Sequence, residues 1–223
     1  MCFSTGASFG AGVVLSLIGV ASIKKAQTST HIFFASIPLI FAIQQISEGF
    51  VWLSLSNPVY ASLQYISTYT FLFFAQVVWP VWVPFSILML EKKEKRKKNE
   101  KLLVAIGGLV SLYLAYCLLS YHVEARIIGY HISYKQNYPT KLSNYGAVLY
   151  IIATIIPPAF SNIKRMWMLS IAILISYIIT TIFYVDYIVS VWCFFASIIS
   201  IAVLTIMHEI RNSQMKSAPS SVL

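Results

Sequence analysis

The chain has 223 residues, of which 58% are hydrophobic and 10% are charged, and it carries a formal net charge of +9 at pH 7. Its mean hydropathy is positive, and such a composition excludes an ordinary soluble domain. The composition instead predicts a protein that is embedded in a lipid bilayer.

Seven apolar segments follow one another along the chain, and each is long enough to cross the hydrocarbon core as a helix. We therefore expect an all-α bundle of seven transmembrane helices in one domain over residues 1–210, followed by a disordered polar tail over residues 211–223. The segments are Thr5 to Ile23, His31 to Leu55, Tyr60 to Leu90, Leu102 to Tyr121, Ser143 to Phe160, Met166 to Tyr184 and Ile188 to Met207.

The positive charges set the expected orientation, because Lys and Arg next to membrane spans are retained on the cytoplasmic side. If the amino terminus faces outward, all but three of the 16 Lys and Arg residues lie inside, including the run EKKEKRKKNEK at residues 91–101. The carboxyl terminus is then cytoplasmic. Because membrane orientation accounts for the charge, we expect the lipid bilayer, and no nucleic acid, as its partner.

The second segment contains the stretch FAIQQISEGFVWL at residues 41–53, in which polar side chains interrupt an apolar helix. Gln44 and Glu48 are four residues apart, Gln45 and Glu48 are three apart, and Trp52 follows Glu48 by four, so all lie on adjoining strips of one helix face. A charged group in hydrocarbon costs from ~2.5 to above 10 kcal/mol. This face is therefore expected to turn into the bundle, about 10 Å below the outer end of the helix.

An outward-facing polar pocket is the hypothesis that follows. Its other members are expected from the same outer layer: Asp186 between the last two segments, Trp192 at the start of the last segment, and His131 in the outer loop, which is long enough to fold back as a lid. The alternative is a buried hydrogen-bond network that only fixes helix packing, with Glu48 protonated or paired with Arg126 or the amino terminus. The predicted ligand-binding residues are Gln44, Gln45, Glu48, Trp52, His131, Asp186 and Trp192.

The third segment contains WPVWVP at residues 79–84, and each proline removes a backbone donor and can bend the helix. A hinge at Pro80 and Pro84 is one reading. The other is that Trp79 and Trp82 belong to an aromatic belt at the inner interface.

The fragments FFAQ at residues 73–76 and FFAS at residues 194–197 lie at corresponding places in the third and seventh segments. They suggest an arrangement of three, one and three helices with a parallel repeat, as in some small transporters. A second FFAS at residues 33–36 favours chance matches in a phenylalanine-rich chain instead.

The sequence shows no motif for a metal or a cofactor, and none is expected. Cys2, Cys117 and Cys193 all fall near the outer ends of their segments, where one disulfide and a spare thiol are possible. A metal-assisted hydrolase acting on lipid, with His122, His131 and Asp186 as ligands and Glu48 as base, is an alternative function. A membrane sensor or assembly partner that transports nothing is another.

Five segments of the sequence are distinctive when taken together: MCFSTGASFGAG at the start, PLIFAIQQISEGFVWL from residue 38, FFAQVVWPVWVP from 73, YHISY from 130 and VWCFFASIIS from 191. They resemble a bacterial family of multi-pass membrane proteins of unknown function, whose members begin with a similar Cys-Phe-Ser segment. The resemblance implies a fold and a location in the bacterial inner membrane, and no reaction. The resemblance draws attention to Cys2, Gln44, Gln45, Glu48, Trp52, Trp79, Pro80, His131, Trp192 and Cys193.

The leading prediction is a carrier that binds a small solute or ion in the outer half of the bundle. Glu48 would be its proton- or cation-responsive group, and Gln44 and Gln45 would orient the ligand by hydrogen bonds. Trp52 and Trp192 would form stacking walls, and the helix of Pro80 and Pro84 would bend between states.

Overall fold

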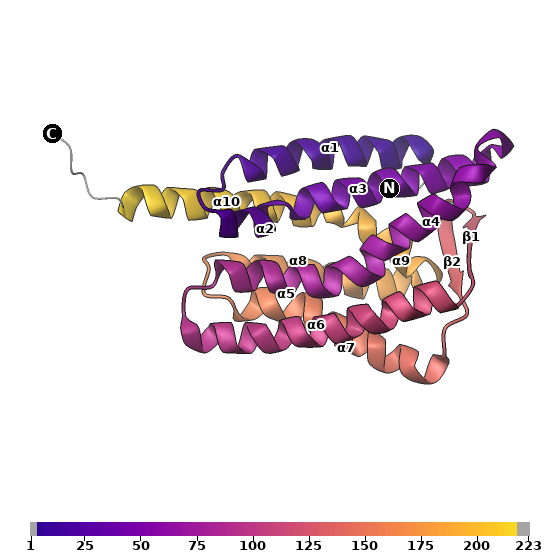
Figure 1. Ribbon diagram of the computed structural model, residues 1–223. Helices are drawn as coiled ribbons and strands as arrows, with labels where there is room; N and C mark the ends of the chain where they lie inside the picture. Colours follow the sequence, from indigo (N-terminus) through magenta and orange to yellow (C-terminus); the bar gives the residue numbers. More distant parts are fainter. Residues whose placement is uncertain (1–3, 218–223) are drawn as a thin grey trace.

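The computed structural model describes residues 4–217, apart from the side chains of residues 140–144, 193–194, 196–198 and 216–217. Helical elements follow one another through its first half, and one of them, η2, is a π-helix. They are α1 (Thr5–Ile23), α2 (Ser29–Ala35), α3 (Ile37–Ser56), η1 (Pro58–Leu63), α4 (Gln64–Leu72), η2 (Phe73–Val78), α5 (Trp79–Leu90) and α6 (Glu94–Ser120) (Figure 1).

The second half begins with two strands and then returns to helices. These elements are β1 (Val123–Ile128), β2 (His131–Gln136), α7 (Thr140–Phe160), α8 (Met166–Phe183), η3 (Val185–Tyr187), α9 (Ile188–Phe194) and α10 (Ala196–Ser217). The helix α10 therefore includes the beginning of the segment that was predicted to be a disordered tail.

Five helical stretches among the described residues are long and apolar enough to cross a membrane: Thr5–Ile23, Ser29–Ser56, Pro58–Leu90, Glu94–Ser120 and Met166–Phe183. A shorter apolar helix covers Tyr145–Phe160. The prediction of a helical membrane bundle is thus confirmed at this level, and the chain is a membrane protein.

The first helix packs closely along the third. The α1 helix begins after Ser4, whose side chain accepts a hydrogen bond from the Ala7 N–H, as expected of an N-cap. Gly12 and Gly19 face α3, and a Cβ atom at Gly19 would lie 2.5 Å from the side chain of Leu39. Glycine is needed at this contact because any larger residue would push the two helices apart.

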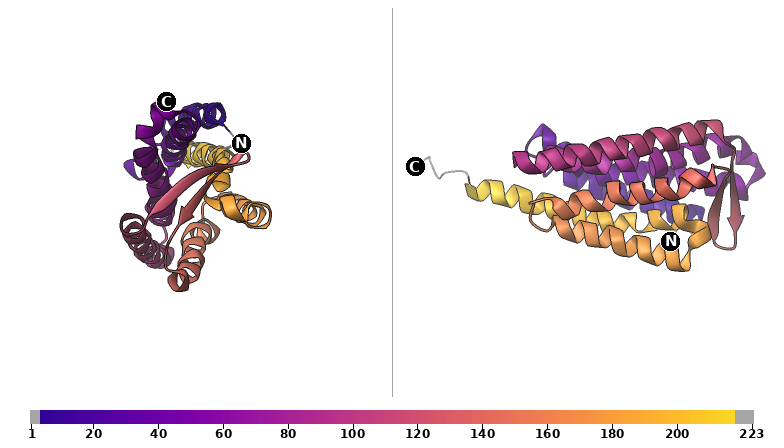
Figure 2. Two further views of the ribbon diagram at one scale, coloured as in Figure 1. Left: turned by 90° about the vertical axis from the view of Figure 1, so that its right-hand side faces the viewer. Right: turned by 90° about the horizontal axis from the view of Figure 1, so that it is seen from below.

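The helices form two groups that lie side by side along a common direction. One contains α1, α3 and α10, and the other contains α5, α6, α7 and α8 (Figures 1 and 2). The largest apolar core joins the groups at the end near the carboxyl terminus. Its fully buried members include Phe34, Ile87, Met166, Val203 and Met207.

The third predicted segment is a continuous but irregular helix. The π-helix η2 stands directly before Pro80, and the carbonyl groups near it find donors on other helices: Ser111 Oγ donates to the Val77 oxygen at 2.6 Å. Pro84 cannot donate to the Pro80 carbonyl, which instead lies against Gly107 of α6, where a Cβ atom would overlap it. Neighbouring helices thus make the prolines tolerable within the membrane.

The outer loop is a β-hairpin, which the all-α prediction did not include. Strands β1 and β2 pair antiparallel from Val123↔Gln136 to Ile128↔His131, and Gly129 in the turn has a φ of 60°, which favours glycine. The hairpin lies across the end of the bundle that is remote from the carboxyl terminus (Figure 2). Burial of Ala125 and Ile132 against Val51 and Trp52 holds it there.

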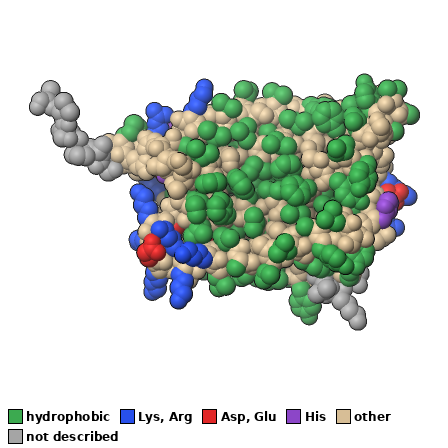
Figure 3. All heavy atoms as spheres, in the orientation of Figure 1, with side chains coloured by type: hydrophobic (Ala, Val, Ile, Leu, Met, Phe, Trp, Pro, Cys, Tyr) green, Lys and Arg blue, Asp and Glu red, His purple; other side chains and the backbone are tan. Residues whose placement is uncertain are grey.

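Lysine and arginine side chains gather at the opposite end of the bundle, whereas hydrophobic side chains cover its flank (Figure 3). There Lys164 and Arg165 pair with Glu209 at 3.4 and 3.3 Å. The hairpin end carries few charges, and Arg126 forms an ion pair with Glu124 there. The charges are therefore separated along the bundle as the sequence predicts.

Candidate functional site

A cavity of about 280 Å³ lies at the centre of the bundle. The residues that line it come from ten elements of the fold: α2, α3, η2, α5, α6, β2, α7, α8, α9 and α10. Its side chains are mainly apolar and aromatic, and among the residues whose side chains the structure describes, no Asp, Glu, Lys, Arg or His lines it. Its aromatic members are Phe34, Phe41, Trp79, Tyr113, Tyr138, Tyr150, Tyr177 and Trp192.

One wall joins α3 to α5 through a buried amide. Trp79 Nε1 donates to Gln44 Oε1 at 2.7 Å, and the ring of Trp79 stacks on Phe41 with a centroid distance of 3.9 Å. Gln44 is 1% exposed. The amide is therefore oriented by a strong bond to the ring, and that ring also lines the cavity.

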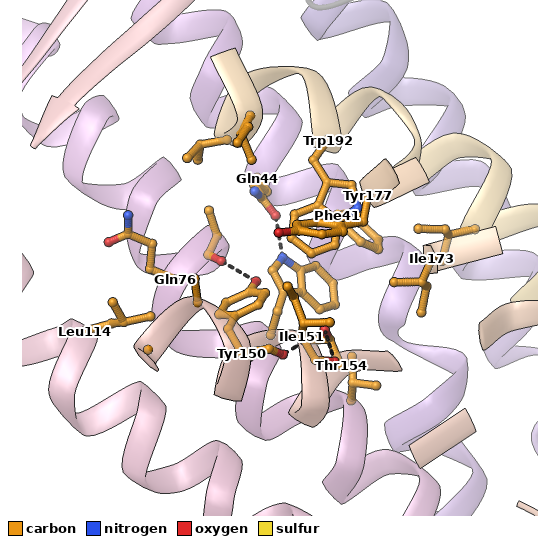
Figure 4. Close-up of a pocket in the computed structure, with 18 of the residues that line it drawn as sticks. Phe41, Gln44, Gln76, Leu114, Tyr150, Ile151, Thr154, Ile173, Tyr177 and Trp192 are labelled. Atoms are coloured by element: carbon orange, nitrogen blue, oxygen red, sulfur yellow. Dashed lines mark hydrogen bonds between the residues drawn. The ribbon is translucent and has the colours of Figure 1, made fainter. Parts of the chain in front are cut away.

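The facing wall is aromatic. Trp192 packs against Tyr150 and Tyr177 and donates its Nε1 proton to Ser176 Oγ at 2.9 Å. Figure 4 shows Tyr150, Tyr177 and Trp192 beside the cavity. These rings present flat faces, which suit an apolar or aromatic molecule.

Tyr150 also ties α7 to the π-helix. Its hydroxyl donates to the Ala75 carbonyl at 2.6 Å. Because Pro80 has no N–H, the carbonyl groups about one turn before it lose a donor from their own helix. Tyr150 supplies one, and this explains how a phenol is placed so deep in the bundle.

Polar side chains gather where the hairpin meets the cavity. Tyr138 Oη donates to Gln76 Oε1 at 3.1 Å, and Gln76 Nε2 donates to Gln136 Oε1 at 2.9 Å. All three residues line the cavity. This end of the cavity is therefore polar, although its remaining walls are apolar.

Irregular helix geometry coincides with all three FFA fragments of the sequence. Residues 33–36 span the break between α2 and α3, residues 73–76 lie within η2, and residues 194–197 span the break between α9 and α10. Phe34, Ala75 and Gln76 from the first two fragments line the cavity. The fragments thus mark positions where helices change course beside the cavity.

Glu48 lies outside the residues that line the cavity. Its side chain is 0% exposed, accepts a short hydrogen bond of 2.6 Å from Ser190 Oγ, and accepts another of 3.3 Å from Gln45 Nε2. The carboxyl group thereby joins α3 to α9. Such bonds are those of the buried network that was the alternative, and Ser190 and Gln45 are among the partners of Glu48.

The remaining predicted residues are spread over the hairpin end. Trp52 is buried beneath the hairpin, and its Nε1 has no hydrogen-bond partner among the described residues. The ring of His131 stacks on Tyr187 at 4.7 Å, and burial lowers the pKa of this histidine. The side chain of Asp186 is exposed in η3, and its backbone oxygen accepts a hydrogen bond from Ser133.

Of the seven predicted ligand-binding residues, only Gln44 and Trp192 line the cavity. Gln45 and Glu48 contact each other. Among the described residues, no group of three or more His, Cys, Asp or Glu side chains could hold a metal ion, so His122, His131 and Asp186 do not form one.

The cysteines give no disulfide that can be described. Cys117 is buried and has a free thiol. Cys2 and the side chain of Cys193 lie outside the described residues.

The sequence also contained a signal for residues that the prediction missed. Gln76 interrupts an apolar segment just as Gln44 does, and the same cost of burying a polar group predicts that it faces inward. Gln136 and Tyr138 gave no such signal, because the hairpin that brings them to the cavity was not predicted.

Comparison with known proteins gives one match. No curated protein and no solved structure matches the chain. A family model described as "Family of unknown function (DUF6629)" matches residues 1–219. The expected membership in a family of unknown function is thus confirmed, and the protein belongs to this family.

Proposed function

We propose that this membrane protein binds a small uncharged molecule in its central cavity and carries it across the bilayer. The observation that supports this proposal is the cavity itself, because it has about 280 Å³ of open space with aromatic walls and a polar end. Ligand pockets are typically concave and mostly apolar, with a few placed polar groups, and have volumes of about 300–1,000 Å³.

The described side chains of the lining include none that is charged, and this favours a neutral ligand over an ion. An ion taken from water into such a site would lose its hydration without gaining a partner of opposite charge. We therefore replace the solute-or-ion hypothesis by a neutral solute. In this proposal Glu48 holds α9 against α3 and does not contact the ligand.

Carrier action is supported by the helix interruptions that surround the cavity. The α2–α3 break and the α9–α10 break interrupt two helices at its walls, and the π-helix η2 makes a third helix irregular there. Discontinuous helices of this kind form the substrate sites of many transporters. A sensor that transports nothing remains the competing function, and transport measurements distinguish the two.

The proposal includes the predicted topology. In it, α7 and the α9–α10 pair cross the membrane in addition to the five long helices, residues 1–210 form one membrane domain, and the charged end faces the cytoplasm of a bacterial cell. Its support is the gathering of lysine and arginine at one end (Figure 3). The repeat of three, one and three helices is likewise a proposal, motivated by the FFA fragments.

Binding can be tested with brominated octanol, a neutral compound whose bromine quenches tryptophan fluorescence on contact. We expect it to quench the protein in nanodiscs, because Trp79 and Trp192 line the cavity. Ile151→Trp places a large ring in the cavity and should abolish the protection against heat that the ligand gives. Val148→Trp is the matched control, since this residue of α7 is 56% exposed and does not line the cavity.

Equal protection of both variants would contradict binding in the cavity. Transport is tested separately in proteoliposomes, by exchange of a labelled neutral analogue whose head group carries enough hydroxyl groups to make its spontaneous crossing slow. Binding without accelerated exchange would support the sensor over the carrier.

A further inference from the structure

The two ends of the cavity differ in polarity. Gln76 and Ile87 belong to one continuous helical stretch, and both line the cavity. They are eleven residues apart in the sequence, so about 16 Å of helix separates them at ~1.5 Å per residue. Around Ile87 the walls are apolar, with Phe34, Val83 and Leu169. The cavity is therefore long and has one polar end.

The polar end contains hydrogen-bonding groups without strong partners. The chain of bonds from Tyr138 through Gln76 stops at Gln136, whose Nε2 is buried and has no partner among the described residues. The hydroxyl of Tyr113, which also lines the cavity, is buried, and among the described residues it has only a weak interaction with the thiol of Cys117. Such groups are unfavourable unless something binds them.

We propose that the ligand is a single-chain lipid with an uncharged head group that accepts hydrogen bonds, such as a monoacylglycerol. This assignment rests on the proposed function of the cavity. The head group accepts hydrogen bonds from Gln136 Nε2 and Tyr113 Oη, and the hydrocarbon chain lies along Trp79, Val83 and Ile87.

The length and volume of the cavity favour one chain. About 16 Å is half of the ~30 Å hydrocarbon thickness of a bilayer, so the cavity matches the depth of one leaflet. Its volume of about 280 Å³ lies just below the usual range for small-molecule pockets, which favours one chain over two.

The test compares four probes of equal chain length on the protein in nanodiscs, with binding measured by native mass spectrometry. They are 1-monolauroylglycerol, laurate, dodecyltrimethylammonium and dodecane. We expect the neutral glycerol ester to bind at least tenfold more tightly than the other three. The two ionic probes lack a partner charge, and dodecane accepts no hydrogen bond.

Two variants test the head-group contacts. Gln136→Leu should weaken monolauroylglycerol binding about tenfold and leave dodecane unchanged. Tyr113→Phe should also weaken binding of the ester, and it should destabilise the free protein little, because this hydroxyl interacts only weakly with the thiol of Cys117. Gln64→Leu in α4 is the control, since it removes a half-buried amide that does not line the cavity.

The outcomes separate the two proposals. In one outcome all four probes bind and Ile151→Trp abolishes the binding of each, but neither Gln136→Leu nor Tyr113→Phe changes the order of their affinities. The cavity is then a binding site, and the head-group assignment is wrong. Tighter binding of either ionic probe also overturns the assignment. If no probe binds, or Ile151→Trp has no effect on binding, the proposed function fails with it.

Discussion

Trp79 of α5 donates its indole proton to the amide oxygen of Gln44 in α3 over 2.7 Å. The bond crosses between the two helix groups, and both residues line the cavity. It therefore connects the shape of the cavity with the stability of the bundle. Gln44→Leu should leave the indole N–H buried without a partner and lower the free energy of unfolding by about 1–3 kcal/mol.

Thermal unfolding in detergent, followed by tryptophan fluorescence, measures this loss. Gln64→Leu, which removes an amide outside the cavity, should change the melting temperature little. If both variants melt alike, the bond between Gln44 and Trp79 does not contribute to stability.

The carboxyl group of Glu48 is expected to act in packing. Ser190→Ala removes the 2.6 Å bond to Glu48, and we expect a loss of about 1–3 kcal/mol in the free energy of unfolding. Binding of the neutral probe should be unchanged, because neither residue lines the cavity. A double-mutant cycle with Glu48→Gln measures the coupling, and additive effects would show that the two side chains act independently.

Two adjacent glycines in α6 give a sharp test of how closely this helix packs on α5. Gly107→Ala would place a methyl group onto the Pro80 carbonyl, so it should destabilise the protein severely. A methyl group at Gly108 would have only Val81 within 4 Å, so Gly108→Ala should stabilise the helix by up to about 1 kcal/mol through helix propensity. Yield and melting temperature in detergent report both changes. Equal stability of the two variants would refute the close approach.

The hydroxyl of Tyr150 should stabilise the irregular helix that contains the prolines. Tyr150→Phe removes the donor to the Ala75 carbonyl and should lower stability by about 1–3 kcal/mol. Tyr145→Phe is the control on the same helix, because Tyr145 is 74% exposed. Hydrogen exchange within residues 73–80 should rise only in the first variant.

Acid should weaken the turn between α5 and α6. Burial alone would raise the pKa of Glu91, but hydrogen bonds from the backbone N–H groups of Lys93, Asn162 and Lys92 outweigh it and lower the pKa below 4.5. The folded state thus binds fewer protons than the unfolded state, so this stabilisation is present above pH 4.5 and is lost as the pH falls through the folded pKa. Glu91→Gln should flatten the acid side of a plot of melting temperature against pH; an unchanged slope would contradict this.

The sequence predicted the helices better than the site, for physical reasons that particular residues show. Hydrocarbon length and hydropathy are local properties, so segments such as Thr5–Ile23 could be located by composition alone. The inward orientation of Gln44 and Glu48 followed from the cost of burying polar groups in lipid.

Which of these inward residues share a cavity depends on how distant helices pack, and spacing along one helix does not contain that information. Glu48 finds Ser190, which is 142 residues away, and Gln44 finds Trp79. The hairpin was missed although its alternating residues VEARII and HISYKQ and the intervening Gly129 are typical of two strands and a turn.

The hairpin connects the cavity to the surface of the protein. Gln136 is the last residue of β2 and also a wall of the cavity, while Tyr130 in the turn is 77% exposed. An antibody fragment that binds the turn would act on the same strand that positions the polar end of the cavity. Ligand binding in the cavity would thereby depend on what binds the hairpin from the aqueous side.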